Sequence, residues 1–535
     1  MKTSIKNIIL SGLLLSTAFS SCKKSTFDDN YYNPEASVEA DIPRLFSGLL
    51  YNQSKSSSNT IMPRYWNLYV FQLPTLGTYS QLFGYTSSPG MYEQKTAYSQ
   101  SRWQYYYTAP LASYKEITKF YETLTTNEDK EGYKIFLQTS KVFLYDQTAQ
   151  MIDMWGDIPF SEAGQVILTG GTIINGKYDD QEALYNQMID DLKVIADELN
   201  NNKTATYYKQ MFDKADLLNL GNLEKWKIYA NSLRLRLAMR ISYANETKAR
   251  QVVTEILGNP TSYPVVTTLA NSIKIDARGT ELRSVVGVDG IKNSFESSGF
   301  NYAPGFIINN LMKPSSDPRL QVFFSKNIKG EYLGLDPNLD ATTQENQISG
   351  NLISRVDSAT FSRNDKFPGI IITPAEVSFL KAEANERWGI GNSAETEYKN
   401  GIKQSIDFWY YVNALNDNAD GTAYVAKTKP TDAQVNTFLS HALIAYTGSK
   451  QEKLEKIASQ NWLNFSVIQA QHAWAEYRRT NFPKLTFSRD NGSQQSPTPP
   501  SRLLYPENER TYNPINYQNV KDKDNLTTKL FWDIN

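Results

Sequence analysis

Apolar residues recur at helical spacing along three stretches in the first half of the chain. From about Lys134, and again over residues 178–199 and 221–243, they follow one another every three or four positions, which is the repeat of one helix face. The members of the three stripes are Phe136, Ser140, Phe143 or Leu144, Gln147, Met151 and Met154; Leu184, Met188, Leu192, Ile195 and Leu199; and Trp226, Ala230, Leu233, Leu237 and Ile241. The pattern predicts three amphipathic helices.

Residues beside these stripes predict where the helices end and how they are held. Gly156 can end the first helix in a left-handed conformation, and Pro159 prevents it from resuming. Asp179 and Asp180 stand where the dipole of the second helix favours negative charge. Three arginines accompany the third stripe, and we expect them to bind carbonyls or carboxylates of neighbouring helices rather than a ligand. They are Arg234, Arg236 and Arg240.

The helical pattern returns near the end of the chain. Thr373, Pro374 and Glu376 predict a capping box, in which threonine and glutamate each bind the other's backbone N–H. The helix that follows is separated from a second one by the turn at residues 389–392, and residues 453–480 predict a third helical stretch. Paired helices of this kind are the unit of tetratricopeptide-type arrays, so the sequence predicts a mainly α fold with such pairs in 134–243 and 374–480.

Two parts of the chain lack this periodicity. Residues 41–125 are rich in aromatic residues, Gly, Ser and Pro, with one probable helix over residues 111–124. Residues 258–370 predict a loop-rich insertion with short strands and one short helix near residues 307–312. Long irregular segments in compact proteins are commonly functional.

The first 22 residues have the layout of a secretory signal. Two lysines precede an apolar run of roughly 10 residues, and small residues lead to Cys22. Such a run is shorter than the ~20 residues that a membrane span needs. Cys22 is the only cysteine of the 535 residues, and its setting is similar to a bacterial lipobox, although Phe19 is bulkier than usual there. We therefore expect residues 1–21 to be a signal peptide, Cys22 to carry lipid, and residues 22–40 to form a flexible tether to one domain over 41–535.

Composition and motifs narrow the possible functions. Lys and Arg number 55 against 56 Asp and Glu, which gives no basic excess for nucleic acid. One cysteine and two histidines leave no disulfide in the mature chain and too few ligands for a His-based or thiolate metal site. The sequence predicts no cofactor and no metal-binding residues, and it does not indicate whether a divalent ion takes part in binding. It contains no nucleophile elbow, zinc-protease motif or phosphate-binding loop, which favours a binding protein over an enzyme. Paired carboxylates of a glycoside hydrolase stay open, because the fold sets their spacing.

Several blocks of the sequence together resemble the SusD/RagB family of outer-membrane nutrient-binding lipoproteins, in its SusD-like branch. Besides Cys22, the blocks are residues 151–163 (MIDMWGDIPFSEA), 226–240 (WKIYANSLRLRLAMR), 317–319 (DPR), 373–384 (TPAEVSFLKAEA), 474–480 (WAEYRRT) and 504–506 (LYP), with Glu509 and Asn513. Two departures are Asn461, where Lys is usual, and Asn481, where Gly is usual.

The resemblance implies a right-handed superhelical scaffold of tetratricopeptide-like hairpins with a loop-rich part that carries the ligand site. It also implies a cell-surface protein that acts as the lid of a SusC-type TonB-dependent channel. Family members commonly capture oligosaccharides and some bind peptides, so an oligopeptide-binding lid is the alternative.

Sugars stack their C–H faces on aromatic rings and need fixed polar partners for their hydroxyls, so a site should combine both on loops. Residues 66–92 and the part of the insertion that contains Phe295, Phe300, Asn301 and Tyr302 fit that description. The predicted ligand-binding residues are Trp66, Tyr79, Phe83, Tyr85 and Tyr92, with Phe300, Asn301 and Tyr302 from across the groove.

Overall fold

A computed structural model describes residues 41–52, 60–169, 175–278, 290–297, 301–417, 421 and 423–535. Cys22, the signal peptide, the tether and Phe300 lie outside the described residues. Residues Ile42–Asn535 form one compact unit. The predicted mainly α fold is confirmed, since short two-stranded pairings are the only sheets among the described residues.

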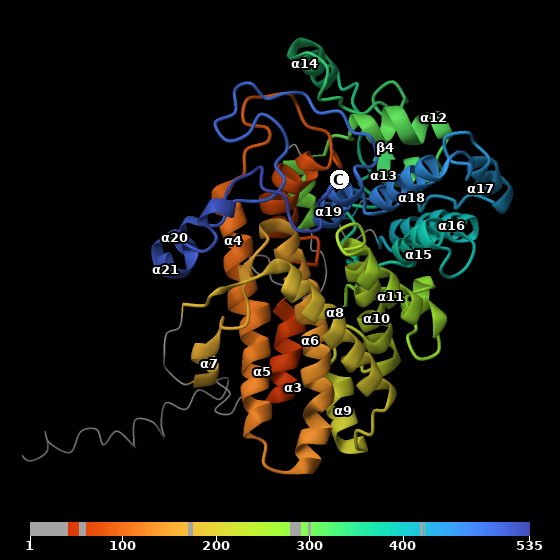
Figure 1. Ribbon diagram of the computed structural model, residues 1–535. Coiled ribbons are helices and arrows are strands. Elements are labelled where there is room, and N and C mark those ends of the chain that lie inside the picture. The colour runs from red at the N-terminus through yellow and green to blue at the C-terminus, as the bar shows by residue number, and fades with distance from the viewer. Residues whose placement is uncertain are drawn as a thin grey trace, which may run out of the picture. The chain divides into compact units, whose positions relative to one another are not determined.

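The first half of the unit is built from helices packed side by side (Figure 1). α3 packs on α5 and α6, while α10 packs on α8 and α11. The helices are α3 (Ile42–Tyr51), η2 (Trp66–Gly77), α4 (Thr96–Tyr106), η3 (Tyr107–Leu111), α5 (Ala112–Thr123), α6 (Asn127–Trp155), α7 (Gln165–Thr169), α8 (Gln181–Asn200), α9 (Thr206–Ala215), α10 (Leu223–Arg240) and α11 (Glu246–Gly258), with strands β1 (Ile158–Pro159) and β2 (Tyr178–Asp179) paired antiparallel.

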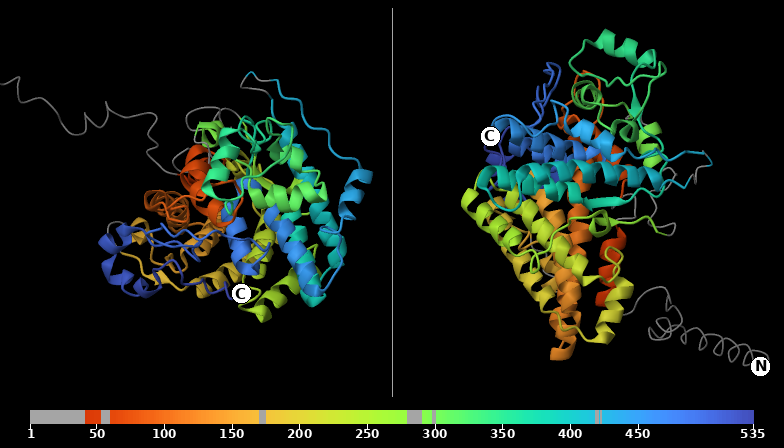
Figure 2. Two further views of the ribbon diagram at one scale, coloured as in Figure 1. Left: turned by 90° about the horizontal axis from the view of Figure 1, so that it is seen from above. Right: turned by 90° about the vertical axis from the view of Figure 1, so that its right-hand side faces the viewer.

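The second half repeats the helix pairing. α15 packs on both α16 and α18, and α18 packs on α19, as two further views show (Figure 2). The elements are α15 (Pro374–Trp388), α16 (Ala394–Ala414), α17 (Asp432–Leu439), α18 (Lys450–Asn464), η7 (Ser466–Ile468), α19 (Ala470–Thr480), α20 (Glu507–Tyr512), α21 (Pro514–Tyr517) and η8 (Lys521–Lys523). Among the helices of the described residues, none is both long and apolar enough to cross a bilayer.

The segment between the two halves, residues 258–370, is largely irregular, as its lack of apolar periodicity predicts. The helix expected near residues 307–312 is present as η6, whereas the nine-residue helix α14 was not predicted. The elements are η4 (Leu269–Asn271), β3 (Ile273–Ile275), η5 (Asn293–Ser297), η6 (Phe306–Met312), α12 (Lys313–Ser315), α13 (Leu320–Phe323), β4 (Phe324–Ser325), α14 (Ala341–Ser349), β5 (Arg355–Val356) and β6 (Gly369–Ile372). β3 pairs with β6 and β4 with β5, both antiparallel.

Helix ends follow the predicted chemistry with two corrections. Gly156 ends α6 at φ 80° and ψ −124°, so its φ is positive and favours glycine, but its ψ lies outside the left-handed helical region that the sequence predicts. Asp180 alone caps α8, by accepting from the N–H groups of Glu182 and Ala183. Asp179 lies in β2 and accepts from Phe160 and Ser161 instead, because the strand turns it away from the helix.

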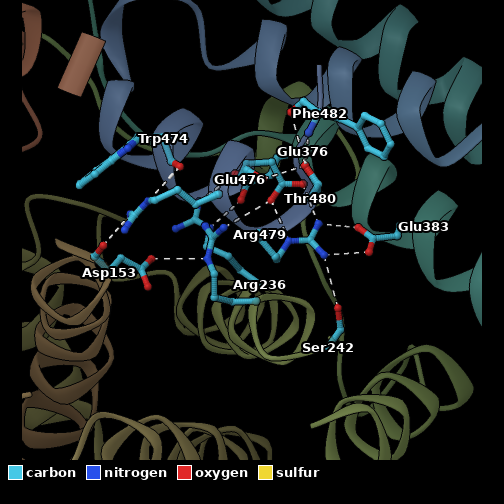
Figure 3. A network of polar contacts seen from close by, with 12 residues as sticks. Asp153, Arg236, Ser242, Glu376, Glu383, Trp474, Glu476, Arg479, Thr480 and Phe482 are labelled. Atoms are coloured by element: carbon cyan, nitrogen blue, oxygen red, sulfur yellow. Dashed lines mark hydrogen bonds and ion pairs between the residues drawn. The ribbon is translucent and has the colours of Figure 1, made fainter. Parts of the chain in front are cut away.

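A buried ionic network joins four helices of the two halves (Figure 3). Arg236 of α10 binds Glu376 of α15 at 2.6 Å, and Arg240 reaches Asp153 and Glu476. Arg479 of α19 binds Glu383 and Glu476, each at 2.6 Å. With Arg234 bound to Glu255 and to the Ile189 carbonyl, the predicted structural role of the three arginines is confirmed.

Candidate ligand-binding site

A cavity of about 290 Å³ lies where the segment after η2 meets the start of the loop-rich insertion. Two tyrosine rings, hydroxyl groups, one lysine and backbone surround it. Its lining residues are Pro74, Thr78, Gly84, Tyr85, Thr86, Ser88, Pro89, Gly90, Met91, Lys95 and Tyr302. The volume is close to the lower end of the roughly 300–1,000 Å³ typical of small-molecule sites.

Close backbone contact brings the two walls together. The N–H of Gly84 donates to the carbonyl of Tyr302 at 2.8 Å. A Cβ at position 84 would lie 2.6 Å from the Ala303 carbonyl oxygen, so only glycine permits this approach. The cavity therefore depends on a contact between residues more than 200 positions apart in the sequence.

Tyr302 is held in place by its neighbours in the insertion. The guanidinium of Arg355 lies over the Tyr302 ring, 4.8 Å from the centroid. Its Nη1 also donates to Oδ1 of Asn301 at 2.6 Å. Arg355 thus fixes both residues through a cation–π contact and a hydrogen bond.

Tyr85 is supported from behind by a cluster of buried aromatic rings. Its ring lies 6.2 Å from that of Phe83 and 6.4 Å from that of Tyr92. Burial, followed by the charge and hydrogen bonding of Tyr92, raises the pKa of Tyr85 well above its ordinary value, and burial raises the pKa of Tyr92 to about 12. Both phenols therefore stay protonated at neutral pH.

The structure distributes the predicted site residues among three environments. Tyr85 and Tyr302 line the cavity together, whereas Asn301 does not line it and is bound by Arg355, which stacks on Tyr302. The rings of Tyr79, Phe83 and Tyr92 are buried in the core, where the Tyr79 hydroxyl donates to the Tyr92 carbonyl and that of Tyr92 to the Ser488 carbonyl. Their faces are packed against protein and support the wall. Trp66 lies on a separate crevice.

The sequence did not indicate the polar residues that line the 290 Å³ cavity, nor a second cavity. Lys95 and the residues of 86–91 follow Tyr85 directly, and only their neighbourhood in sequence could have indicated them. A larger cavity of about 670 Å³ lies between 315–321 and 428–441 and contains no predicted site residue. Its lining, which includes Gln321, Gln434 and His441, is joined by tertiary contacts that no sequence pattern indicates.

Ionisable groups at these cavities form no metal-binding set among the described residues. Within the described ranges, no three His, Cys, Asp or Glu side chains are placed to hold a metal ion. His472 is buried on α19 with its ring 5.6 Å from that of Phe465. Burial, then the charges of Arg236 and Arg240, lower the pKa of His472 well below its ordinary value.

A comparison with protein families identifies the family of this chain. Residues 35–506 match the model of the SusD-like family described as "starch-binding associating with outer membrane". The chain belongs to the SusD-like family. A comparison with curated protein sequences finds no match.

Solved SusD-like structures share the fold at low sequence identity. A structure described as a chitin-binding protein is 21% identical, with a TM-score of 0.72 over 92% of this chain and 100% of its own. A chitin-binding SusD homologue from Flavobacterium johnsoniae is 22% identical, with a TM-score of 0.68 over 92% and 99%. A SusD homologue from Bacteroides fragilis is 18% identical, with a TM-score of 0.68 over 92% and 100%.

The SusD-like sequence blocks coincide with the scaffold and not with the cavity. Residues 226–240, 373–384 and 474–480 supply the arginines and glutamates of the ionic network. No residue that lines the 290 Å³ cavity belongs to a block. The family therefore identifies the fold, while the chemistry of the cavity belongs to this chain.

Proposed function

We propose that this protein is a cell-surface outer-membrane lipoprotein that binds nutrient oligosaccharides and passes them to a SusC-type TonB-dependent channel, whose lid it forms. The ligand site proposed is the cavity between Tyr85 and Tyr302. Cys22 carries the lipid in this proposal, and binding needs no cofactor or metal. The protein acts by binding and not by catalysis.

The observation that carries the proposal is that two tyrosine side chains and several polar side chains line one cavity. Tyr302 is half-buried and offers ring surface for sugar C–H faces, Tyr85 is 8% exposed and contributes an edge of the wall, and Thr86, Ser88 and Lys95 offer hydrogen bonds for sugar hydroxyls. The backbone contact at Gly84 and the Arg355 contacts hold these groups in place before a ligand arrives. Such preorganisation reduces the entropic cost of binding.

Calorimetry against a panel of oligosaccharides tests this site. The panel begins with maltooligosaccharides and N-acetylglucosamine oligomers, because the family description names starch and two similar structures are described as chitin-binding. Tyr302→Ala should weaken binding about 10-fold or more, a loss of ~1.4 kcal/mol. Tyr512→Ala, which removes an exposed tyrosine of α20, is the matched control.

Three outcomes would count against parts of the proposal. Absence of binding to any member of a broad panel of neutral and acidic oligosaccharides would reject oligosaccharide binding. A peptide that co-purifies with the native protein would favour oligopeptide binding instead. Loss of affinity in Gln434→Ala but not in Tyr302→Ala would move the site to the 670 Å³ cavity, which Gln434 lines.

Membership of the SusD-like family supports the partner and the membrane. Affinity purification of the tagged protein from detergent-solubilised outer membranes should recover a large β-barrel channel at stoichiometric amounts. Recovery of the lipoprotein alone under mild detergent would contradict the lid role.

A further inference from the structure

A narrow crevice lies between the first half of η2 and α4, apart from the cavities described above. Trp66, which is 37% exposed, stands at it with Tyr98 and Ser101. The lining residues are Trp66, Asn67, Val70, Phe71, Tyr98, Ser101, Arg102 and Tyr105. Its free volume is about 20 Å³, which admits a group little larger than one water molecule. The crevice therefore suits one small polar group and not a whole sugar ring.

Arg102 is the charged residue of this lining, and it forms no ion pair with another described residue. The side chain is 8% exposed, and its Nη2 donates to Oε1 of Gln147 at 3.3 Å. Its Nη1 has no hydrogen-bond partner, and no carboxylate of the described residues lies within ion-pair distance. Burial lowers the pKa of Arg102 to about 10, so it is still charged at neutral pH.

The carboxylate whose charge acts on Arg102 is bound by other groups. Asp146, whose charge acts on Arg102, binds the Tyr229 hydroxyl at 2.6 Å and Arg236 at 3.3 Å. Buried arginines of the ionic network each have a carboxylate partner, as Arg479 has two. Arg502 also leaves nitrogens without partners, but it is fully buried and lines none of these cavities. Arg102 thus combines a desolvated, unpaired charge with a crevice.

Asn67 and Ser101, two further polar residues of the crevice, already have partners within the protein. Asn67 donates to the Met62 carbonyl and accepts from Gln72, and the Ser101 hydroxyl donates to the Ala97 carbonyl. The guanidinium is the one charged group of the lining, and its Nη1 is the atom that a ligand would satisfy. A guanidinium matches a planar carboxylate, which it binds through two parallel hydrogen bonds.

We propose that this crevice binds the carboxylate of an acidic sugar residue, with Arg102 as its counter-charge and the exposed ring of Trp66 beside the sugar. The inference rests on the proposed function and makes it more specific, because it selects oligosaccharides that carry a carboxylate. The unpaired arginine is then retained for binding, at a cost in stability.

Calorimetry with a glucuronic-acid-terminated oligosaccharide and its glucose-terminated counterpart tests the proposal. We expect the acid to bind at least 10-fold more tightly, and we expect this preference to be lost in Arg102→Gln. Trp66→Ala changes an exposed residue and should weaken binding of the acid without unfolding the protein. Arg250→Gln on the exposed face of α11 removes the same charge elsewhere and should keep the preference.

Thermal unfolding separates a ligand-binding role from a structural one. Because Arg102 has no carboxylate partner, Arg102→Gln should melt at the same temperature as the wild type or higher. A lower melting temperature with an unchanged acid preference would overturn the proposal, as would equal affinity for the acidic and neutral sugars. If neutral sugars bind and Tyr302→Ala weakens them while no acid preference exists, the crevice proposal fails alone. If no sugar of the broad neutral and acidic panel binds, the proposed function fails with it.

Discussion

Individual buried charges hold the loop-rich insertion on the helices. Arg319 is fully buried and binds Asp317 at 2.6 Å. It also donates to Ser405 of α16 at 3.1 Å and to Gln460 of α18 at 2.7 Å. One guanidinium therefore connects a turn of the insertion with two helices of the second half, which explains why the block 317–319 belongs to the scaffold.

Arg319→Met should lower the free energy of unfolding by about 3–5 kcal/mol, because it leaves the Asp317 carboxylate buried without its cation. The double variant Asp317→Leu/Arg319→Met should recover part of this loss, since no charge then remains. Urea unfolding at pH 7 measures both. Lys399→Ala breaks an exposed pair on α16 and is the control, with an expected loss below about 1 kcal/mol. An Arg319→Met loss as small as the control's would contradict the role of the ion pair.

His472 makes stability depend on pH. Burial, Arg236 and Arg240 depress its pKa in the folded protein, so below about pH 6.5 the unfolded chain binds a proton that the folded chain excludes. The free energy of unfolding should therefore fall as pH falls below 6.5, by at most about 1.4 kcal/mol per pH unit from this residue. Urea unfolding of the wild type and His472→Gln between pH 8 and 5 should give curves that diverge below 6.5. Parallel curves would contradict the prediction.

The helices that the sequence predicts correctly are those whose periodic apolar residues are also the buried ones. The stripe of Trp226, Leu233 and Leu237 is buried in α10, as its spacing indicates. By contrast, residues 66–77 were expected to be loop and form the π-helical segment η2, although Pro74 lies inside it. Ten of its residues are buried, and this tertiary packing overrides the weak local helix signal. The single stretch expected over 453–480 is broken by η7, at Ser466 with φ 50°.

The capping box at α15 was only half right, and the difference has a physical reason. Thr373 Oγ1 accepts from the Glu376 N–H at 3.3 Å as predicted. The Glu376 carboxylate does not reach back, because Arg236 binds it at 2.6 and 2.8 Å. The buried ion pair between Arg236 and Glu376 therefore replaces the hydrogen bond that the capping box predicts. Sequence spacing cannot indicate this ion pair, because its two residues are 140 positions apart.

Thr373→Ala should cost about 1 kcal/mol or more of stability, since it removes the cap and the acceptor for Asn464 Nδ2. Thr373→Ser keeps the oxygen and should recover most of that loss. Urea unfolding measures both variants. Equal losses in the two variants would assign the effect to the missing methyl group and contradict the cap.

At the scale of the molecule, the sequence could predict the scaffold but only part of the site. Tyr85 and Tyr302 belong to segments whose aromatic and polar composition stands out, and they meet at one cavity. Tyr79, Phe83 and Tyr92 have the same composition but are buried, because ring type does not indicate which face is covered. Arg102 carried no sequence signal at all, since the lack of a partner is a property of the folded surroundings.

The division of the chain predicts that binding and anchoring are separable. Ile42–Asn535 form one compact unit, and every residue proposed to contact ligand belongs to it. A chain that begins at Asp41 should therefore keep the melting temperature and the oligosaccharide affinity of the full-length protein. Cys22→Ala in the full-length chain should keep both as well and should move the protein from the detergent phase to the aqueous phase in a phase-partition assay.

Several acyl chains are needed for stable anchoring, so loss of the residue that carries them should abolish membrane anchoring. A Cys22→Ala protein that stays in the detergent phase would reject the lipid at Cys22, while a shortened chain that loses affinity would place part of the site before residue 41.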